Sequence, residues 1–322
     1  MNVHPWVWFA TVAGLILILA IDIFVIGRKP HEPSLRECTA WVCLYVGLAV
    51  LFGIGILVFS SGQYAGEFFA GWITEYSLSA DNLFVFLVIL TRFGVPRTYQ
   101  QTALLIGIIL ALVMRGLFIA LGAAAISIFS WVFYIFGAVL IWTAIQFLRQ
   151  GDQDETDYKE NAVIRWAKRN LPATDEYNGV RLTLVQNGKR LATPMLLVMI
   201  ALGTTDLLFA LDSIPAIYGL TQEPYLVFTA NVFALMGLRQ LYFMIGGLVN
   251  RLVYLTYGLA VILGFIGVKL ILHALHENNL PFINGGHPIE AAPDIGIVFS
   301  LSFIVGTLLV TTLASVVRSR KL

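Results

Sequence analysis

Long apolar blocks occupy most of this chain, separated by short polar breaks. A bilayer core of ~30 Å needs about 20 apolar residues in a helix, so each block predicts one membrane-spanning helix. The breaks carry turn residues, such as Gly94-Val95-Pro96, Gln222-Glu223-Pro224 and Asn284-Gly285-Gly286. We therefore expect an all-α, polytopic membrane helix bundle with about nine transmembrane helices, near residues 6–27, 39–60, 67–91, 101–124, 129–148, 194–218, 225–249, 252–273 and 294–317.

The composition supports a membrane protein and excludes a water-soluble one. Hydrophobic residues make up 58% of the chain and charged residues only 12%, which is about half the charged share of a soluble domain. The net charge of +1 gives no reason to expect a nucleic-acid partner. Met1–Phe9 lacks the basic start of a signal peptide, so the first block is expected to be retained as a span. Cys38 and Cys43 fit no redox or metal motif.

Lysine and arginine positions test the number of spans and predict the orientation. If the N-terminus lies outside and the nine spans alternate, all but three of the 20 basic residues fall on the cytoplasmic side. The three exceptions, Arg115, Arg239 and Lys269, lie within spans. A wrong number of helices would distribute the charges over both faces, so the positive-inside rule favours nine spans with the N-terminus out and the C-terminus in.

The blocks and breaks predict five regions along the chain. Residues 1–65 hold two N-terminal helices, 66–149 and 194–275 hold three each, and 276–322 hold an outer loop and the last helix. Residues 150–193 form the one long cytoplasmic loop. It begins with acidic residues and contains an amphipathic stretch, 162–171, and an Asn187-Gly188 turn between β-prone runs, which predicts a short helix and a hairpin. We expect a connector or regulatory flap there.

The two groups of three spans resemble each other. Glu75 and Asp81-Asn82 in the third span recur as Asp206 and Asp212-Ser213 in the sixth. Proline and arginine follow in the same order, with Pro96 and Arg115 matching Pro224 and Arg239, and Trp142–Phe147 matching Phe265–Leu270. Because three spans are an odd number, the second unit runs through the membrane in the opposite direction. The chain thus predicts an inverted three-helix repeat, an architecture common among secondary transporters.

The acids of these motifs are the candidate functional residues, because a charge in mid-bilayer costs several kcal/mol. The two acids of each motif are six residues apart, about 9 Å of rise and roughly 120° of rotation on a regular helix. Either each span contributes one acid to a shared centre, with Asp81 and Asp206 favoured by depth, or the helices unwind and add carbonyl ligands. Arg115 and Arg239 provide supporting charges. Four carboxylates and two guanidinium groups leave about two negative charges, which one divalent cation would neutralise.

The neighbouring polar atoms are oxygens, since no cysteine or histidine lies close to either motif. Oxygen ligands suit Mg²⁺, Ca²⁺ or Mn²⁺ rather than Zn²⁺ or Cu⁺. The expected metal-binding residues are Glu75, Asp81, Asn82, Asp206, Asp212 and Ser213. A second group, with His273, His276 and Glu277, is expected at the outer mouth, where a solvated loop is the simpler reading.

The motifs resemble those of the TerC family, which includes the Alx proteins. The stretch from Glu75 to Ile89 is similar to the family's first acidic motif, and 204–243 is similar to its second almost throughout. The similarity covers roughly 66–275 and includes the Ala192-Thr193-Pro194 sequence. It implies tellurium resistance or manganese export of the LysE-like transporter group, with the six residues above as the acidic-motif positions. Gly203 departs from the family pattern, since many relatives have Glu there, and this bears on the number of anionic ligands.

Together these features predict a secondary-active exporter of Mn²⁺ in the cell (cytoplasmic or inner) membrane, with Ca²⁺ a further substrate, protons a candidate counter-ion and no tightly bound cofactor. The alternative is a non-transporting membrane scaffold that supports tellurium resistance or delivers metal to secreted proteins. We do not expect an enzyme, because paired membrane aspartates without core histidines are weak support for a hydrolase. The sequence leaves the oligomeric state open.

Overall fold

The chain is described here from a computed structural model. It describes residues 3–26, 34–129, 131–150, 162–170, 174, 177–186, 189–245, 254–278, 280–281, 283–289, 292–293 and 295–319. Some side chains within the helices also lie outside this description, that of Asp81 among them. The elements are α1 (Pro5–Ile26), α2 (Leu35–Phe59), α3 (Gly62–Arg92), α4 (Arg97–Ile128), α5 (Val132–Gln150), α6 (Ala162–Asn170), β1 (Thr183–Gln186), β2 (Lys189–Ala192), α7 (Pro194–Tyr218), α8 (Pro224–Leu235), α9 (Leu238–Ile245), α10 (Leu255–His276), a 3-10 turn (Asn284–Gly286) and α11 (Ile297–Ser319).

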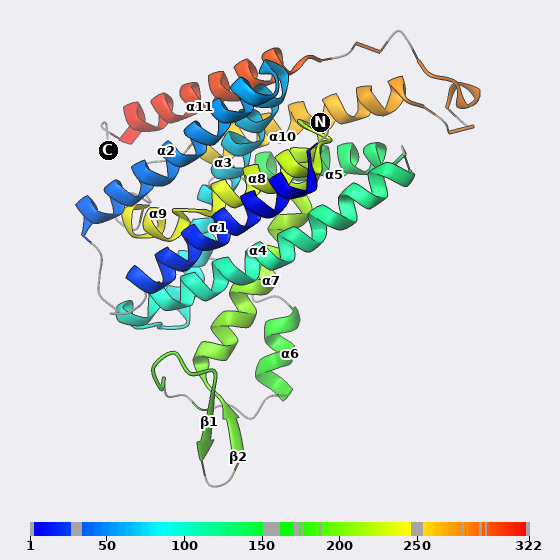
Figure 1. The fold of residues 1–322 in the computed structure, drawn as a ribbon. Coiled ribbons are helices and arrows are strands. Elements are labelled where there is room, and N and C mark those ends of the chain that lie inside the picture. The colour runs from blue at the N-terminus through cyan, green and yellow to red at the C-terminus, as the bar shows by residue number, and fades with distance from the viewer. Residues whose placement is uncertain are drawn as a thin grey trace.

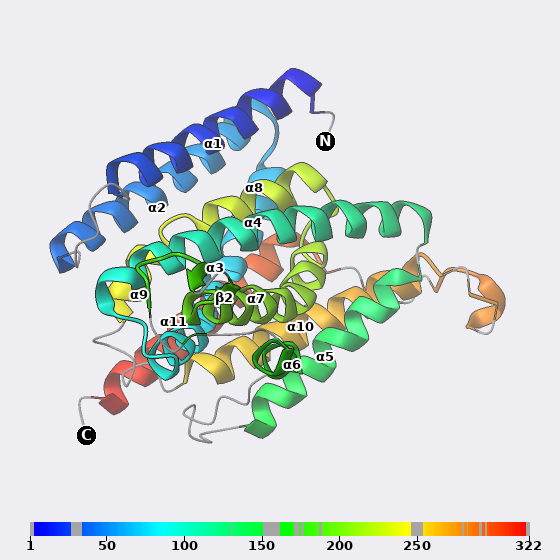
Figure 2. The same ribbon diagram turned by 90° about the horizontal axis from the view of Figure 1, so that it is seen from below.

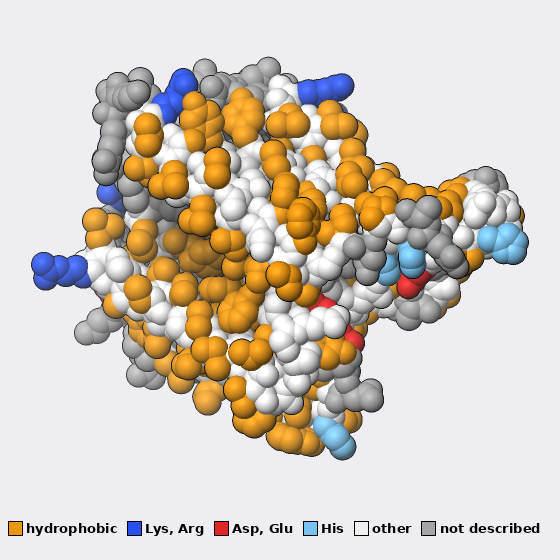
Figure 3. Space-filling model, turned by 90° about the horizontal axis from the view of Figure 1, so that it is seen from above, with side chains coloured by type: hydrophobic (Ala, Val, Ile, Leu, Met, Phe, Trp, Pro, Cys, Tyr) orange, Lys and Arg blue, Asp and Glu red, His pale blue; other side chains and the backbone are white. Residues whose placement is uncertain are grey.

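The predicted all-α membrane bundle is confirmed. Within the described residues, 8 segments are long and apolar enough to cross a membrane, and α1 is a further helix at the first predicted span. The face of the molecule seen in Figure 3 is largely hydrophobic, as lipid contact requires. In the same view Lys and Arg side chains lie toward one end, and Asp, Glu and His toward the other. The number of nine spans and their orientation remain predictions.

The seventh predicted span is one crossing built from two helices, not one continuous helix as expected. Helix α8 ends at Leu235, Met236 has extended backbone angles, and α9 begins at Leu238. Gly237 between them has a φ of 82°, a conformation that residues with a Cβ rarely adopt. The sequence prediction missed this break because the apolar run of α8 continues through Met236, Gly237 and Leu238.

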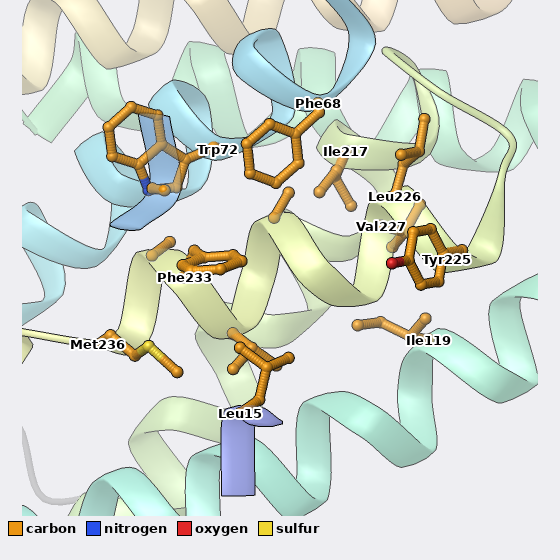
Figure 4. Close-up of a cluster of buried hydrophobic side chains, with 14 of the residues drawn as sticks. Leu15, Phe68, Trp72, Ile119, Ile217, Tyr225, Leu226, Val227, Phe233 and Met236 are labelled. Atoms are coloured by element: carbon orange, nitrogen blue, oxygen red, sulfur yellow. The ribbon is translucent and has the colours of Figure 1, made fainter. Parts of the chain in front are cut away.

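Helix α8 is surrounded by the rest of the bundle. Almost all of its side chains are buried, which is expected of a helix that is apolar on every side. Figure 4 shows Phe233, Tyr225 and Leu226 of α8 among side chains from several other helices. These contacts join α1, α3, α4 and α7 through the cluster that contains Leu15, Phe68, Trp72, Ile119 and Ile217.

Helices α5 and α10, the third helices of the two predicted units, lie side by side (Figures 1 and 2) and pack closely. Their contact is reciprocal. A Cβ added to Gly137 would lie 2.8 Å from the carbonyl oxygen of Gly267, and one added to Gly267 would lie 3.0 Å from that of Gly137. The same additions would meet Ile271 Cγ1 at 2.6 Å and Ile141 Cγ1 at 2.9 Å. Each glycine thus has the same surroundings on the other helix, as expected when a local two-fold axis relates α5 and α10.

The glycine contact gives another register for the third helices than the sequence match. Gly137 and Gly267 are 130 residues apart, close to the offset of 131 between Glu75 and Asp206. The sequence match of Trp142 with Phe265 used an offset of 123. The two registers differ by about two helical turns, and the inverted repeat stays a prediction.

The segment after α5 corresponds to the predicted helix and hairpin. Helix α6 buries Ile164 and Ala167 and packs against α7, and β1 pairs with β2 in antiparallel register from Thr183↔Ala192 to Gln186↔Lys189. The acidic opening of the segment and the Asn187-Gly188 turn lie outside the described residues. Helix α6 lies beside the first turns of α7, and the hairpin extends beyond the start of α7 (Figure 1).

Candidate cation site

Two acids from different predicted units share one arginine at the centre of the bundle. Arg115 of α4 places Nη1 2.6 Å from Oε2 of Glu75 on α3, and Nη2 3.5 Å from Oδ1 of Asp206 on α7. The three side chains are buried, with 0%, 1% and 4% of the surface of Glu75, Arg115 and Asp206 exposed. The cluster therefore holds two carboxylates against one guanidinium, which leaves an excess of about one negative charge when both acids are ionised.

The helices around this cluster are regular, which decides between the two sequence-based alternatives. Helix α3 runs without interruption through Ser79 and Ala80, and α7 continues through Pro215. One acid from each span thus meets at the centre, and neither helix unwinds to offer extra carbonyl groups. The central pair among the described side chains is Glu75 and Asp206. Pairing of Asp81 with Asp206 stays a prediction, because the Asp81 side chain is not described.

Helical spacing explains which motif residues accompany these two acids. On α3, Glu75, Ser79 and Asn82 follow an i, i+4, i+7 pattern and are all buried. On α7, Asp206, Ala210 and Ser213 repeat this pattern and are buried as well. Residues at these spacings share one helix face.

The second acid of each motif is six residues after the first and therefore points about 120° away. Asp212 accordingly is only half-buried, and its Oδ1 accepts a hydrogen bond of 2.8 Å from Thr143 Oγ1 of α5. The sequence prediction grouped Asp212 with the central acids and missed Thr143. No sequence signal marks Thr143, since its role depends on how α5 packs.

Several buried polar atoms near the pair make no hydrogen bond with any described residue. They include Oε1 of Glu75, Oδ2 of Asp206, Nε and Nη2 of Arg115, Oγ of Ser79, Oγ of Ser213 and Nδ2 of Asn231. Ser213 lies close enough to Glu75 to act on its carboxylate electrostatically, although without good hydrogen-bond geometry. Buried polar atoms of folded proteins normally have partners, so a group of orphan oxygens points to a cation or a proton.

Arg239, the predicted counterpart of Arg115, does not join the central cluster. It is buried and lines a small cavity at the start of α9 together with Cys38 of α2 and Gln101 of α4. Gly203, the residue that departs from the family pattern, faces α4. A Cβ at that position would lie 2.5 Å from Cδ2 of Leu110. In this chain a leucine thus fills the space that a larger side chain at 203 would need.

A cavity of about 780 Å³ opens at the end of the bundle where α3 begins and α7 ends. Glu67 of α3 lines it and is largely buried. Its carboxylate accepts hydrogen bonds from Gln63 Nε2 at 3.0 Å and from Thr221 Oγ1 at 2.6 Å. Further lining residues are Glu223, Lys269, His273 and Tyr218. Glu67 precedes Glu75 by eight residues, or roughly 12 Å along the helix.

The predicted ligands do not form one compact metal centre in the described part of the chain. There, no three His, Cys, Asp or Glu side chains lie close enough together to hold a metal ion. Glu75, Asp206 and Ser213 come together, Asn82 lies on the same helix face, and Asp212 turns toward α5. The full set of six ligands therefore stays a prediction.

Comparison with known proteins identifies the family from which these motifs come. The integral membrane protein TerC family matches residues 60–322. The chain belongs to the TerC family. The family match extends well beyond the acidic motifs and confirms the family predicted from them.

Relatives match this TerC-family chain over nearly its whole length. A membrane protein of Mycobacterium tuberculosis is 51% identical over 318 residues, covering 98% of this chain and 80% of the relative. One from Myxococcus xanthus is 37% identical over 317 residues, covering 98% and 93%. A protein of Escherichia coli strain K12, named "Putative membrane-bound redox modulator Alx", is 34% identical over 306 residues, covering 92% of each chain. No solved structure matches.

Proposed function

We propose that this TerC-family protein is a secondary-active transporter that exports a divalent metal cation, with Mn²⁺ as its principal substrate. The observation that carries the proposal is the buried excess of negative charge. Glu75 and Asp206 share one guanidinium, and one oxygen of each acid has no donor among the described residues. Leaving a buried carboxylate uncompensated costs several kcal/mol, and a cation removes that cost.

The chemistry of the cluster supports a hard cation. Carboxylate and hydroxyl oxygens surround the pair, and such donors suit Mn²⁺, Ca²⁺ and Mg²⁺ better than softer ions. The preference for Mn²⁺ over Ca²⁺ comes from the family resemblance. The two free cysteines lie on α2, one buried and one exposed, so the redox activity in the name of the Escherichia coli relative does not enter this proposal.

The arrangement of acids suggests the route of export. Each predicted unit contributes one acid to the centre, as alternating access between inverted units requires. The bond between Thr221 and Glu67 shows that the end of α7 and the start of α3 lie at the same end of the bundle. Asp212, about 9 Å beyond Asp206 along α7, and Glu67 both lie toward that end. An ion leaving the centre would pass Asp212 and reach the cavity that Glu67 lines.

Proteoliposome flux tests the proposal directly. Purified full-length protein should move Mn²⁺ down an imposed gradient, with Ca²⁺, Mg²⁺ and Zn²⁺ as competitors and with the pH gradient present or collapsed. Glu75→Gln and Asp206→Asn should each lower the flux by at least about a hundredfold, since each removes one charge from the site. Glu37→Gln, a change at an acid in the first turn of α2, should leave the flux unchanged.

The same experiment distinguishes transport from the scaffold alternative. If the folded wild-type protein moves none of the four cations, transport is excluded and the non-transporting scaffold becomes the better reading. If flux depends on the pH gradient, protons are the counter-ion. We place the protein in the cytoplasmic membrane as part of this proposal, since export to the outside requires that location.

A further inference from the structure

Arg115 is held in a way that is unusual for a purely structural buried arginine. The planar guanidinium has five N–H donors and commonly binds carboxylates through two parallel hydrogen bonds. Arg115 makes one short contact, from Nη1 to Glu75, while its Nη2 lies 3.5 Å from Asp206. Its Nε and Nη2 have no hydrogen-bond acceptor among the described residues. The guanidinium therefore offsets part of the charge of the acids without using its full bonding capacity.

The two acids also have oxygens that accept no hydrogen bond from any described residue. Oε1 of Glu75 and Oδ2 of Asp206 have no donor within the described chain. The two acids and Arg115 thus all keep polar atoms without hydrogen-bond partners there. A different partner for the acids could satisfy more of these atoms. An ion that binds both carboxylates would take over the position that Arg115 now holds between them.

We infer that Arg115 is the resident counter-cation of this transporter. It offsets one of the two negative charges of Glu75 and Asp206 while the carrier is unloaded, moves away when a divalent cation binds between them, and returns when that cation leaves. The inference rests on the proposed function and assigns to Arg115 the selection of divalent over monovalent ions. Only Arg115 would have this role, because Arg239, its predicted counterpart, lines a different cavity.

The charges explain the selectivity. A monovalent cation that displaced Arg115 would replace one positive charge by another and leave one carboxylate uncompensated. A divalent cation neutralises both carboxylates at once. Ion pairs are much stronger in a low-dielectric interior than in water. The second positive charge of a divalent cation therefore provides the free energy that the displacement of Arg115 requires.

The same exchange supports the return step of the cycle. Two bare carboxylates in mid-bilayer would hold the unloaded carrier in one orientation, because exposing them to the apolar interior is costly. Arg115 offsets one of these two charges without any ion from solution. Net transport, which needs the unloaded return, therefore depends on Arg115. One-for-one exchange of Mn²⁺ does not, because the loaded carrier crosses in both directions.

Comparing net flux with exchange in the same proteoliposomes tests this asymmetry. Arg115→Gln should lower net Mn²⁺ flux by about tenfold or more while tracer Mn²⁺/Mn²⁺ exchange stays within about threefold of wild type. In detergent, the same variant should bind Mn²⁺ about tenfold more tightly, since the internal competitor is gone. Glu75→Gln should lose net flux and exchange together.

Two further variants control for folding. Arg115→Lys keeps the charge but not the planar fork, so its ratio of net flux to exchange should lie between those of wild type and Arg115→Gln. Arg239→Gln removes an arginine that is 3% exposed and lines another cavity, with Cys38 and Gln101, so it should leave that ratio unchanged. Size-exclusion profiles and thermal unfolding establish that each variant is folded.

The outcomes separate the two proposals. If wild type transports Mn²⁺ but folded Arg115→Gln retains full net flux, or loses exchange as strongly as net flux, Arg115 is not the counter-cation. An unchanged ratio of net flux to exchange in both Arg115 variants would also show that Arg115 is not the counter-cation. If wild type neither transports nor exchanges any of the cations, the proposed function is wrong and the role of Arg115 is withdrawn with it.

Discussion

Gly137 of α5 and Gly267 of α10 contact each other reciprocally, each leaving room for the carbonyl oxygen of the other. The equivalence of their surroundings is what the predicted inverted repeat would produce at this interface. It also predicts matched effects of mutation on the two sides.

Gly137→Ala and Gly267→Ala should destabilise the protein by similar amounts. In each variant the new methyl group would meet a backbone carbonyl at 3.0 Å or less, and overpacking of this kind costs about 1–3 kcal/mol. Thermal unfolding in detergent measures the effect. Gly55→Ala on α2, with no atom within 4 Å of the added Cβ, is the matched control. A large effect at only one of the two glycines would argue against the two-fold relationship.

Thr143 and Asp212 should behave as one unit in transport. Thr143→Val removes the hydroxyl that donates to Asp212 with little change in shape, and a hydrogen bond to a charged group contributes about 1.5–3 kcal/mol. Mn²⁺ flux should fall in Thr143→Val and in Asp212→Asn. In the double variant it should be no lower than in Asp212→Asn alone. Additive losses would show that Thr143 acts on something else. Thr39→Val, which affects an exposed hydroxyl bonded to its own helix, is the control.

Gly237→Ala should destabilise the crossing formed by α8 and α9 more than Gly94→Ala destabilises the turn before α4. Both glycines have positive φ, at 82° and 62°, so both variants incur the conformational cost of about 1 kcal/mol. Only at Gly237 would the new Cβ also meet a side chain, Cδ2 of Tyr45 at 3.1 Å. Melting temperatures of the two variants provide the comparison. Equal shifts would mean that the Tyr45 contact relaxes without cost.

Tyr177→Phe should loosen the attachment of the segment after α6 to the end of α3. The Tyr177 hydroxyl donates a 2.6 Å hydrogen bond to the carbonyl of Phe93, and burial raises the pKa of this phenol. Because the folded pKa lies above the unfolded value of about 10, the contribution of the neutral phenol is complete below that pH. It is lost as pH rises through the folded pKa.

The measurement is the difference in melting temperature between wild type and Tyr177→Phe. It should correspond to about 1 kcal/mol, stay constant up to about pH 9 and shrink above pH 10. A difference that does not change with pH in this range would mean that the phenol does not ionise before the protein unfolds.

The sequence by itself determined the class of protein and the chemistry at its centre. Hydropathy predicts the helices because a bilayer accepts only apolar segments with satisfied backbones. The acids of the repeat stand out for the same reason, since Glu75 and Asp206 would be too costly in these spans without a function. Their helix faces were readable as well, because Ser79 and Asn82 follow Glu75 at helical spacing.

Only the tertiary structure decided which groups meet. Arg115 joins Glu75 and Asp206 in the described structure, and Arg239 lines a different cavity, although the sequence prediction matched the two arginines. Thr143 reaches Asp212 from another helix, and Gly137 and Gly267 set the register of α5 against α10. Uniformly apolar helices can pack in several rotations and registers with similar burial. The partners therefore follow from close packing between helices, which no hydropathy pattern along one chain contains.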